Sequence, residues 1–201
     1  MAIWGEDTPD AWDVALNALI SRLRTVLRRL SPPAPMRIEG DVGRYQLVLP
    51  AGVFVDAERA RVALHQAETL ARQADPDRAV GKARVALEIA ARGFLAGEEA
   101  PWIEGQRRQL RDIECRAIEC LAEAELTRER PHLAEDEVRR LIEVEPTRES
   151  AYRLLMRALV VRGNRGQLAG VMADCRRALR DRAGTSPSPQ TEDLFRRLIQ
   201  P

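Results

Sequence analysis

Residues 18 to 30, ALISRLRTVLRRL, carry arginines in a pattern that could bind nucleic acid. On a helical wheel of about 100° per residue, Arg22 and Arg24 fall on one polar flank, where guanidinium groups can pair with phosphates or with guanine O6 and N7. Asn17 lies on the same flank and could reach an adenine. This flank also holds Ser21, Thr25, Arg28 and Arg29. A plain amphipathic helix with a solvated polar face has the same pattern, so the helix alone leaves both interpretations open.

The element that would position these side chains is a helix over residues 11 to 30. Thr8-Pro9 favours its start, and Ser31-Pro32-Pro33 ends it because proline cannot continue a helix. Its apolar residues recur at helical spacing, which predicts one stripe facing a protein core. The stripe comprises Leu16, Leu19, Ile20, Leu23, Leu27 and Leu30. Basic amphipathic helices can also lie on membranes, but this stripe has no aromatic residue beyond Trp12, so we expect no membrane contact.

A hairpin is expected directly after this helix. The sequence MRIEGDVGRYQLVL over residues 36 to 49 contains two strand-like runs around Gly40-Asp41-Val42-Gly43. Arg44 lies near the tip and joins Asn17, Ser21, Arg22, Arg24, Thr25 and Arg28 as the candidate DNA-binding set. We therefore predict one small unit over residues 1 to 50 and a second domain over residues 51 to 201.

Composition favours helices for the rest of the chain. The 201 residues are 45% hydrophobic but only 4% aromatic, which suits packed Ala and Leu helices better than a β-sandwich. The net charge of +1 means that the whole molecule is not attracted to nucleic acid or to anionic membranes. Any basic site must therefore be local.

The region after Val55 reads as successive helices with a repeat of about 34 residues, the tetratricopeptide (TPR) period. Ile118 pairs at this offset with Tyr152, and four further pairs share it: Leu121 with Leu155, Ala134 with Leu168, Val138 with Met172, and Leu141 with Cys175. A weaker copy lies upstream at Ala63, Ala67, Leu70, Ala79, Ala83 and Ala86. We predict a short TPR-like solenoid of about three repeats, whose concave surface is the better candidate for protein contact.

A loop is predicted over Gly93 to Gly105, between the first and second repeats. It contains Phe94 and Trp102, which either fold over the solenoid as part of a helix connection or form the edge of a partner-binding groove. We name Phe94, Trp102 and Tyr152 as candidate partner-contacting residues.

The sequence gives no support for an enzyme. His65 and His132 lack thiol or carboxylate neighbours at ligand spacing, and no phosphate loop or nucleophile motif is present. Acidic clusters such as Glu135-Asp136-Glu137 are interpreted as solvated helix faces. The three cysteines, Cys115, Cys120 and Cys175, are interpreted as buried apolar residues in a reducing cytoplasm. We expect no catalytic residues, no metal, no cofactor and no membrane span.

Three ordered segments resemble a known family. They are GRYQLVLP at 43 to 50, FLAGEEAPWIEGQRRQLRDI at 94 to 113, and RESAYRLLMRALVVRGNRGQLAGVMADCRRALRD at 148 to 181, followed by Pro187-Ser188-Pro189. Together they resemble the bacterial transcriptional activator domain of the Streptomyces antibiotic regulatory protein family. In that family a TPR-like domain follows a winged helix of the OmpR/PhoB type. The expected fold is therefore mostly α, with a partial winged helix, made of one helix and a β-hairpin, before the helical repeats.

The resemblance implies roles for the first 50 residues. IWGEDTP at 3 to 9 resembles the turn before the recognition helix, residues 17 to 27 resemble that helix with SRLR at its core, and residues 36 to 49 resemble the wing. Because family members carry a sheet and two helices upstream, this chain is expected to be a fragment, a degenerate member or a sequence with a misplaced start codon.

The implied function is that of a cytoplasmic transcriptional activator. In the family, activation implies tandem binding to direct repeats in DNA and recruitment of RNA polymerase. The expected partners are DNA, RNA polymerase or another regulator, with a homodimer possible. The alternative is a TPR-like interaction module that does not bind DNA.

Overall fold

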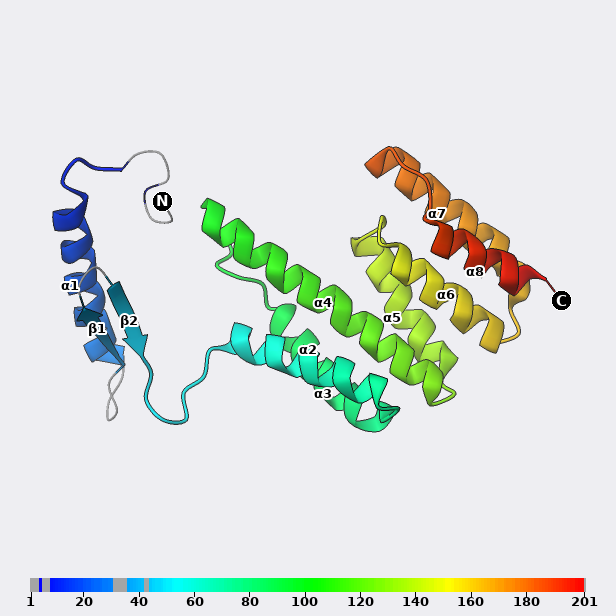
Figure 1. The fold of residues 1–201 in the computed structure, drawn as a ribbon, viewed down its shortest axis with the longest axis horizontal. Helices are drawn as coiled ribbons and strands as arrows, with labels where there is room; N and C mark the ends of the chain where they lie inside the picture. Colours follow the sequence, from blue (N-terminus) through cyan, green and yellow to red (C-terminus); the bar gives the residue numbers. More distant parts are fainter. Residues whose placement is uncertain (1–3, 5–7, 31–35, 42–43, 201) are drawn as a thin grey trace. The chain divides into compact units, whose positions relative to one another are not determined.

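The computed structural model describes residues 4, 8–30, 36–41 and 44–200. The chain forms two compact units: residues 1–56 with 97–105, and residues 57–96 with 106–201. Figure 1 shows the elements of each unit. The predicted domain boundary at residues 50 and 51 stays a prediction.

The first unit contains the predicted helix and hairpin. Helix α1 spans Trp12–Leu30, and strands β1 (Arg37–Asp41) and β2 (Arg44–Val48) pair antiparallel. In their register Ile38 lies opposite Leu47, and Gly40 lies opposite Tyr45. Both elements were predicted from the sequence and are confirmed. The expected helix stop at residues 31–33 and hairpin-loop residues 42–43 lie outside the described residues.

The expectation that the whole leucine stripe of α1 faces a core is wrong. Leu27 is buried, Leu16 and Ile20 are half-buried, and the remaining leucines are exposed: Leu19 at 40%, Leu23 at 46% and Leu30 at 67%. A two-stranded hairpin is narrower than the stripe, so among the elements described next to α1 it covers only part of the apolar face.

In the second unit, proline residues begin several helices. Pro76 and Pro131 stand at the start of α3 and α5, where the missing N–H costs no helical hydrogen bond and the fixed φ suits the first turn. Asp75 caps α3 by accepting a hydrogen bond from the Arg78 backbone N–H. Helix α7 ends at Ala183 and is followed by Gly184, whose φ of 61° is left-handed. The helices that follow the hairpin in the chain are α2 (Asp56–Arg72), α3 (Pro76–Ala90), α4 (Pro101–Thr127), α5 (Pro131–Val144), α6 (Glu149–Val161), α7 (Leu168–Ala183) and α8 (Pro189–Ile199), with a 3-10 turn at Arg165–Gln167; the first residues of α2 and α4 belong to the first unit.

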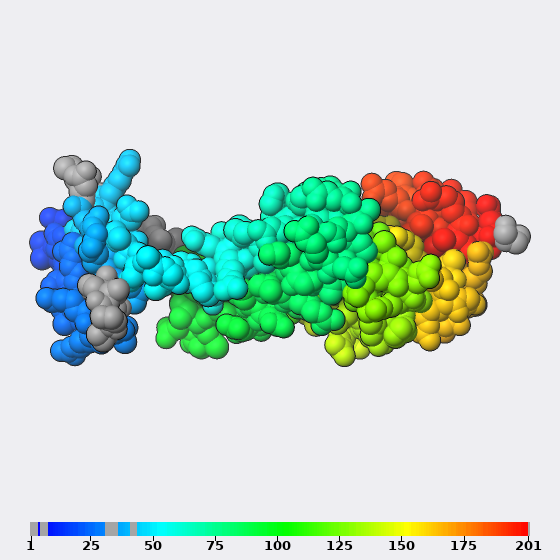
Figure 2. Space-filling view, turned by 90° about the horizontal axis from the view of Figure 1, so that it is seen from below, coloured from blue at the N-terminus to red at the C-terminus, as the bar shows by residue number. Residues whose placement is uncertain are grey.

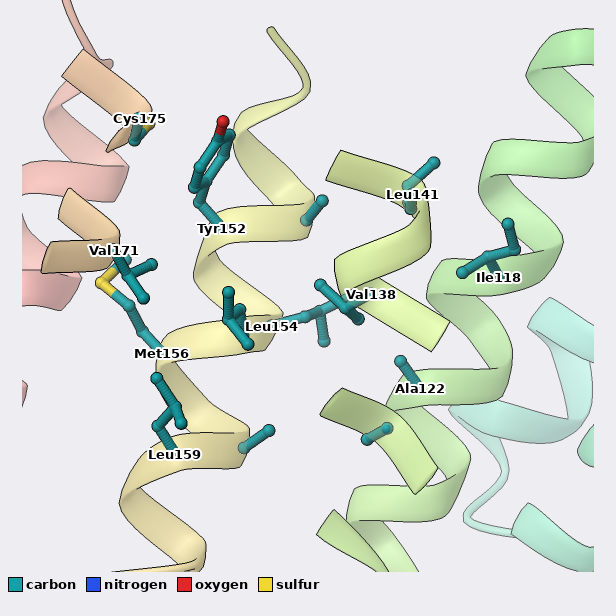
Figure 3. Close-up of a cluster of buried hydrophobic side chains, with 14 of the residues drawn as sticks. Ile118, Ala122, Val138, Leu141, Tyr152, Leu154, Met156, Leu159, Val171 and Cys175 are labelled. Atoms are coloured by element: carbon teal, nitrogen blue, oxygen red, sulfur yellow. The ribbon is translucent and has the colours of Figure 1, made fainter. Parts of the chain in front are cut away.

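The predicted 34-residue repeat corresponds to the buried core. All ten residues of the five predicted pairs are buried, and the six residues of the upstream copy are buried as well. Figure 3 shows side chains from α4, α5, α6 and α7 pointing toward one another, including Ile118, Val138, Tyr152 and Cys175. A separate cluster joins α2, α3 and α4 through small residues such as Ala60 and Ala117. The helical-repeat fold is therefore confirmed.

Two local expectations for this region are wrong. The predicted loop over Gly93 to Gly105 ends earlier, because α4 begins at Pro101 and includes Trp102 and Gly105; proline is favoured in the first helical turn. The cluster that contains Glu135 is not wholly solvated, because Glu135 is only 7% exposed. It accepts hydrogen bonds from Arg139 and Arg162, which pair its charge on two sides.

Polar contacts attach the last helix to the repeats. Figure 2 shows α8, in red, lying directly against the yellow and orange segments of α6 and α7. The Ser188 backbone N–H and hydroxyl both donate to Glu149 Oε2, at 2.8 and 2.7 Å. Thr191, which is fully buried, accepts a hydrogen bond from Arg153 at 2.9 Å. The position of α8 therefore depends on a small polar network around Glu149 as well as on apolar packing.

Candidate nucleic-acid interface

Helix α1 presents three faces, set by the period of 3.6 residues per turn. One face, centred on the buried Leu27, packs on the hairpin. A second is polar and exposed and contains Ser21, Arg22, Arg28 and Arg29. A third is apolar and exposed and contains Trp12, Leu19, Leu23, Val26 and Leu30. The predicted DNA-binding residues of α1 lie on the polar face or at its border with the hairpin.

Tyr45 ties one end of this interface together. Its hydroxyl donates a hydrogen bond to Asn17 Oδ1 at 2.7 Å, which joins β2 to α1. The ring crosses over Gly40 on the paired strand, where an added Cβ would lie 3.0 Å from two ring carbons. Glycine at this position therefore makes room for the ring that reaches the helix.

Arg24 forms the second link between α1 and the hairpin. Its Nε and Nη2 donate to the Ile38 backbone oxygen at 3.2 and 3.1 Å. A fork of two hydrogen bonds to one acceptor fixes both the position and the plane of the guanidinium group. Arg24 thus holds β1 against the helix and cannot also present those two donors to a DNA base.

The remaining predicted residues extend along the exposed face. The Thr25 hydroxyl donates to the Ser21 backbone oxygen at 3.1 Å, and Arg28 Nη2 donates to the Thr25 hydroxyl at 3.2 Å. Arg22 is exposed, and no hydrogen bond of its guanidinium group is seen among the described residues. Arg44 begins β2 and is exposed. The structure therefore brings six of the seven predicted DNA-binding residues onto α1 and places the seventh on the hairpin.

Two residues of this interface were not identified from the sequence. Tyr45 was missed, although the alternation of β2 and the facing Gly40 would have placed it on the helix side of the hairpin. Arg37 was missed because it stands at the first residue of a short strand, where alternation says little. It pairs with Glu39 at 2.7 Å on the same strand face.

The three candidate partner-contacting residues differ in burial, and Phe94 and Tyr152 belong to different apolar clusters. Phe94 is half-buried and packs on the α2, α3 and α4 cluster, and its backbone oxygen accepts from Arg107 at 3.0 Å. Tyr152 is only 2% exposed, belongs to a different cluster, and donates its hydroxyl to the Pro146 oxygen at 3.0 Å. Trp102 lies in the first turn of α4 and is 43% exposed. Of the three, Trp102 presents the most surface to solvent.

The three cysteines are buried, and their thiols are poor nucleophiles because they stay protonated. Burial raises the pKa of Cys115, Cys120 and Cys175 to about 11, so each thiol is neutral at physiological pH. Their interpretation as buried apolar residues is confirmed. Within the described ranges no group of His, Cys, Asp or Glu side chains could hold a metal ion. In the same ranges, every helix falls short of the length and apolarity needed to cross a membrane.

Comparison with known proteins identifies related sequences. The family described as "Bacterial transcriptional activator domain" matches residues 55–199. The chain is similar to "Regulatory protein AfsR" of Streptomyces griseus, with 28% identity over 207 residues, which covers 99% of this chain and 20% of the relative. The chain therefore spans about a fifth of the length of that relative.

A solved structure has the same fold. The chain is similar to the structure titled "Mycobacterium tuberculosis EmbR in complex with low affinity phosphopeptide", with a TM-score of 0.82 and 21% identity. The similarity covers 99% of this chain and 52% of that one. At this identity the likeness supports the fold of the helix, hairpin and helical repeats and no more.

Proposed function

The chain belongs to the bacterial transcriptional activator domain family, and from this premise we propose that it is part of a cytoplasmic transcriptional regulator that binds duplex DNA through α1 and the hairpin. In this proposal the exposed polar face of α1 enters the major groove, and Arg44 on the hairpin reaches the backbone beside it. The helical repeats contact RNA polymerase or another regulator. The similarity to a regulatory protein of Streptomyces griseus is consistent with this role.

One observation carries the DNA-binding proposal. Helix α1 is fixed to the hairpin through Asn17 and Arg24, while Ser21, Arg22, Arg28 and Arg29 stay on its exposed face. A helix that enters the major groove needs a rigid mount on one side and hydrogen-bond donors on the other. Arg22 can pair with guanine O6 and N7 or with a phosphate, and Arg28 and Arg29 extend the basic row toward the end of the helix.

A second candidate function is a protein-interaction module that does not bind DNA. It is favoured by the exposed apolar face of α1, which leaves residues such as Leu23 and Leu30 without cover among the described residues. In that case the helical repeats would act through a protein partner or a second copy of the chain, and the apolar face of α1 would be part of the contact.

A salt titration of DNA binding separates the two functions. Affinity for a mixed duplex is measured by fluorescence anisotropy from about 50 mM to 200 mM salt. Phosphate contacts predict a linear fall of log affinity with log salt, with a slope of roughly −0.9 per contact. Arg22→Ala should weaken binding by roughly tenfold, since an arginine that reaches a base or phosphate contributes about 1–3 kcal/mol.

A matched control is Arg84→Ala, an exposed arginine on α3 outside this interface. It removes the same charge and should leave affinity close to that of the wild type. If the wild-type chain does not bind duplex DNA at about 50 mM salt, where electrostatic binding is strong, the interaction module is the better description.

A further inference from the structure

A cavity of about 440 Å³ opens between α1 and β1, on the side where the helix and the hairpin meet. Its lining comprises Ser21, Arg24, Arg28, Met36, Arg37 and Ile38. Among the described residues of this lining, the charged side chains are all arginines.

The three guanidinium groups are held in different ways. Arg24 is fixed by its two hydrogen bonds to Ile38, and its Nη1 has no partner among the described residues. Arg28 Nη2 donates a hydrogen bond to the Thr25 hydroxyl. Arg37 reaches the cavity from the opposite element. Three like charges that share a pocket repel one another unless an anion lies between them, and oxygen atoms of a phosphate match the donors of several arginines at once.

The geometry of duplex DNA indicates which phosphate would occupy this position. Major and minor grooves alternate, so one sugar-phosphate backbone always separates a major groove from the minor groove beside it. If α1 lies in the major groove and the hairpin extends over the neighbouring backbone, that backbone must pass the junction of α1 and β1. The three arginines stand at this junction.

We infer that the cavity between α1 and β1 is a binding site for a DNA backbone phosphate, with Arg37 and Arg28 as its direct ligands and Arg24 as the fixed wall. This inference rests on the proposed DNA-binding function and adds Arg37, which lies off the recognition face of the helix. A phosphate held here carries no sequence information but sets the depth and register of α1 in the groove.

Glu39 competes with that phosphate in the free protein. Arg37 Nε donates to Glu39 Oε1 at 2.7 Å, and both side chains are well exposed, at 65% and 58%. An exposed pair of this kind is weak, so a phosphate can replace the carboxylate. Two substitutions on one strand should therefore act in opposite directions, since Arg37→Gln removes a ligand and Glu39→Gln removes its competitor.

The test uses the full chain and fluorescence anisotropy with a labelled duplex at several salt concentrations. Arg37→Gln should weaken binding by roughly fivefold near 100 mM salt and reduce the salt slope by about one. Glu39→Gln should strengthen binding by roughly two- to threefold, because Arg37 is then released from its intramolecular pair. Neither substitution removes a buried group, so far-UV circular dichroism should match the wild type.

A matched pair of controls lies on α8. Arg196 and Asp193 form an ion pair at 2.8 Å with the same exposures as the first pair, 65% and 58%. Arg196→Gln and Asp193→Asn change the net charge by the same amounts as the test substitutions. If the α8 variants change affinity as much as the hairpin variants do, the effect is one of net charge, and the phosphate site is overturned.

The possible failures are distinguishable. If the wild type binds DNA and the Arg37 and Glu39 variants bind equally well, DNA binding stands and the phosphate site is wrong. If the wild type does not bind DNA, the proposed function fails. The cavity is then tested with inorganic phosphate, followed by NMR of the arginine Nε–H groups. Saturable shifts at Arg37 and Arg28, with a weaker response of Arg28 in Arg37→Gln, support a phosphate site, and no shift overturns it.

Discussion

In the helical body each helix pair encloses side chains that are wholly buried, whereas the described parts of α1 and its hairpin bury only Leu27 and Ile38. The body is held by apolar packing across α4, α5, α6 and α7. The helix and hairpin are held by the Tyr45 and Arg24 hydrogen bonds as much as by packing. A single substitution in the body therefore removes apolar packing, whereas a single substitution in the helix or hairpin can remove a hydrogen bond that joins them.

This difference fits the proposed roles of the two regions. A stack of repeats gains stability from every buried face, and a partner can contact its outer surface without disturbing the core. A DNA-reading helix must keep its polar side exposed and still hold a fixed angle, so directional hydrogen bonds supply the precision that a small apolar core cannot. Polar links also tie α8 to the body, at Glu149, so the body combines both kinds of contact.

The largest predicted effect is in the body. Leu141 is 1% exposed, and Leu141→Ala should lower the free energy of unfolding by about 2–5 kcal/mol, because the lost contacts leave a cavity. Urea denaturation followed by circular dichroism measures this change. Val144→Ala on the same helix is the control, since Val144 is 53% exposed and its substitution should cost less than about 0.5 kcal/mol. Equal losses at the two positions would contradict the packing described for α5.

The second prediction concerns the polar attachment of α8. Burial alone would raise the pKa of Glu149, but hydrogen bonds from Thr191 and Ser188 outweigh burial and lower it below its ordinary value of 4.5. A carboxylate with a lowered folded pKa stabilises the fold above its unfolded pKa, and this contribution is lost as the pH falls through the folded pKa. Glu149→Gln should therefore cost about 1–2 kcal/mol at pH 7 and progressively less below pH 4.5.

Urea denaturation between pH 7 and pH 3.5 measures this difference. The control is Glu143→Gln, which changes an exposed carboxylate on α5 that has no hydrogen bond among the described residues. Its stability curve should run parallel to that of the wild type. If Glu149→Gln also gave a parallel curve, the network around Ser188 would contribute nothing that depends on charge.

The two regions also differ in how far the sequence predicts them. The 34-residue offset identified buried positions such as Ala134 and Leu168, because a repeated packing geometry imposes a repeated pattern of residue sizes. Family membership and the helical-repeat fold were predicted and are confirmed. The end of the loop near residue 101 was predicted wrongly, because proline is found both after the end of a helix and in its first turn.

Sequence patterns predict the contacts of the interface residues less completely than they predict the buried positions of the repeats. Amphipathic spacing placed Asn17 and Arg24 on a polar flank but could not show that each bonds to the hairpin. Those contacts join residues 28 and 14 positions apart in the chain, and they depend on the angle between the helix and the hairpin. Strand alternation could place Tyr45 on the helix side of the hairpin, but its hydrogen bond to Asn17 arises only after the two elements pack.

The smallest predicted effect lies at the contact between Gly40 and Tyr45. Tyr45→Phe should cost only about 0.5–1 kcal/mol, because the ring is 41% exposed and water can replace its lost hydrogen bond to Asn17. Gly40→Ala alone should also destabilise the hairpin slightly, since the new methyl group meets the ring at 3.0 Å. In a Tyr45→Ala background the same change should become neutral or stabilising, because alanine suits a strand better than glycine does.

This double-mutant cycle isolates the contact between the ring and the strand from the general effect of alanine. Amide hydrogen exchange of β1 and β2 gives the local free energy of opening for each of the four proteins. The expected coupling is about 0.5–1 kcal/mol, well below the cost of Leu141→Ala in the body. If Gly40→Ala had the same effect in both backgrounds, the position of the Tyr45 ring would not depend on the absence of a side chain at position 40. The Tyr45 hydrogen bond to Asn17 would then hold α1 without any contribution from the glycine at position 40.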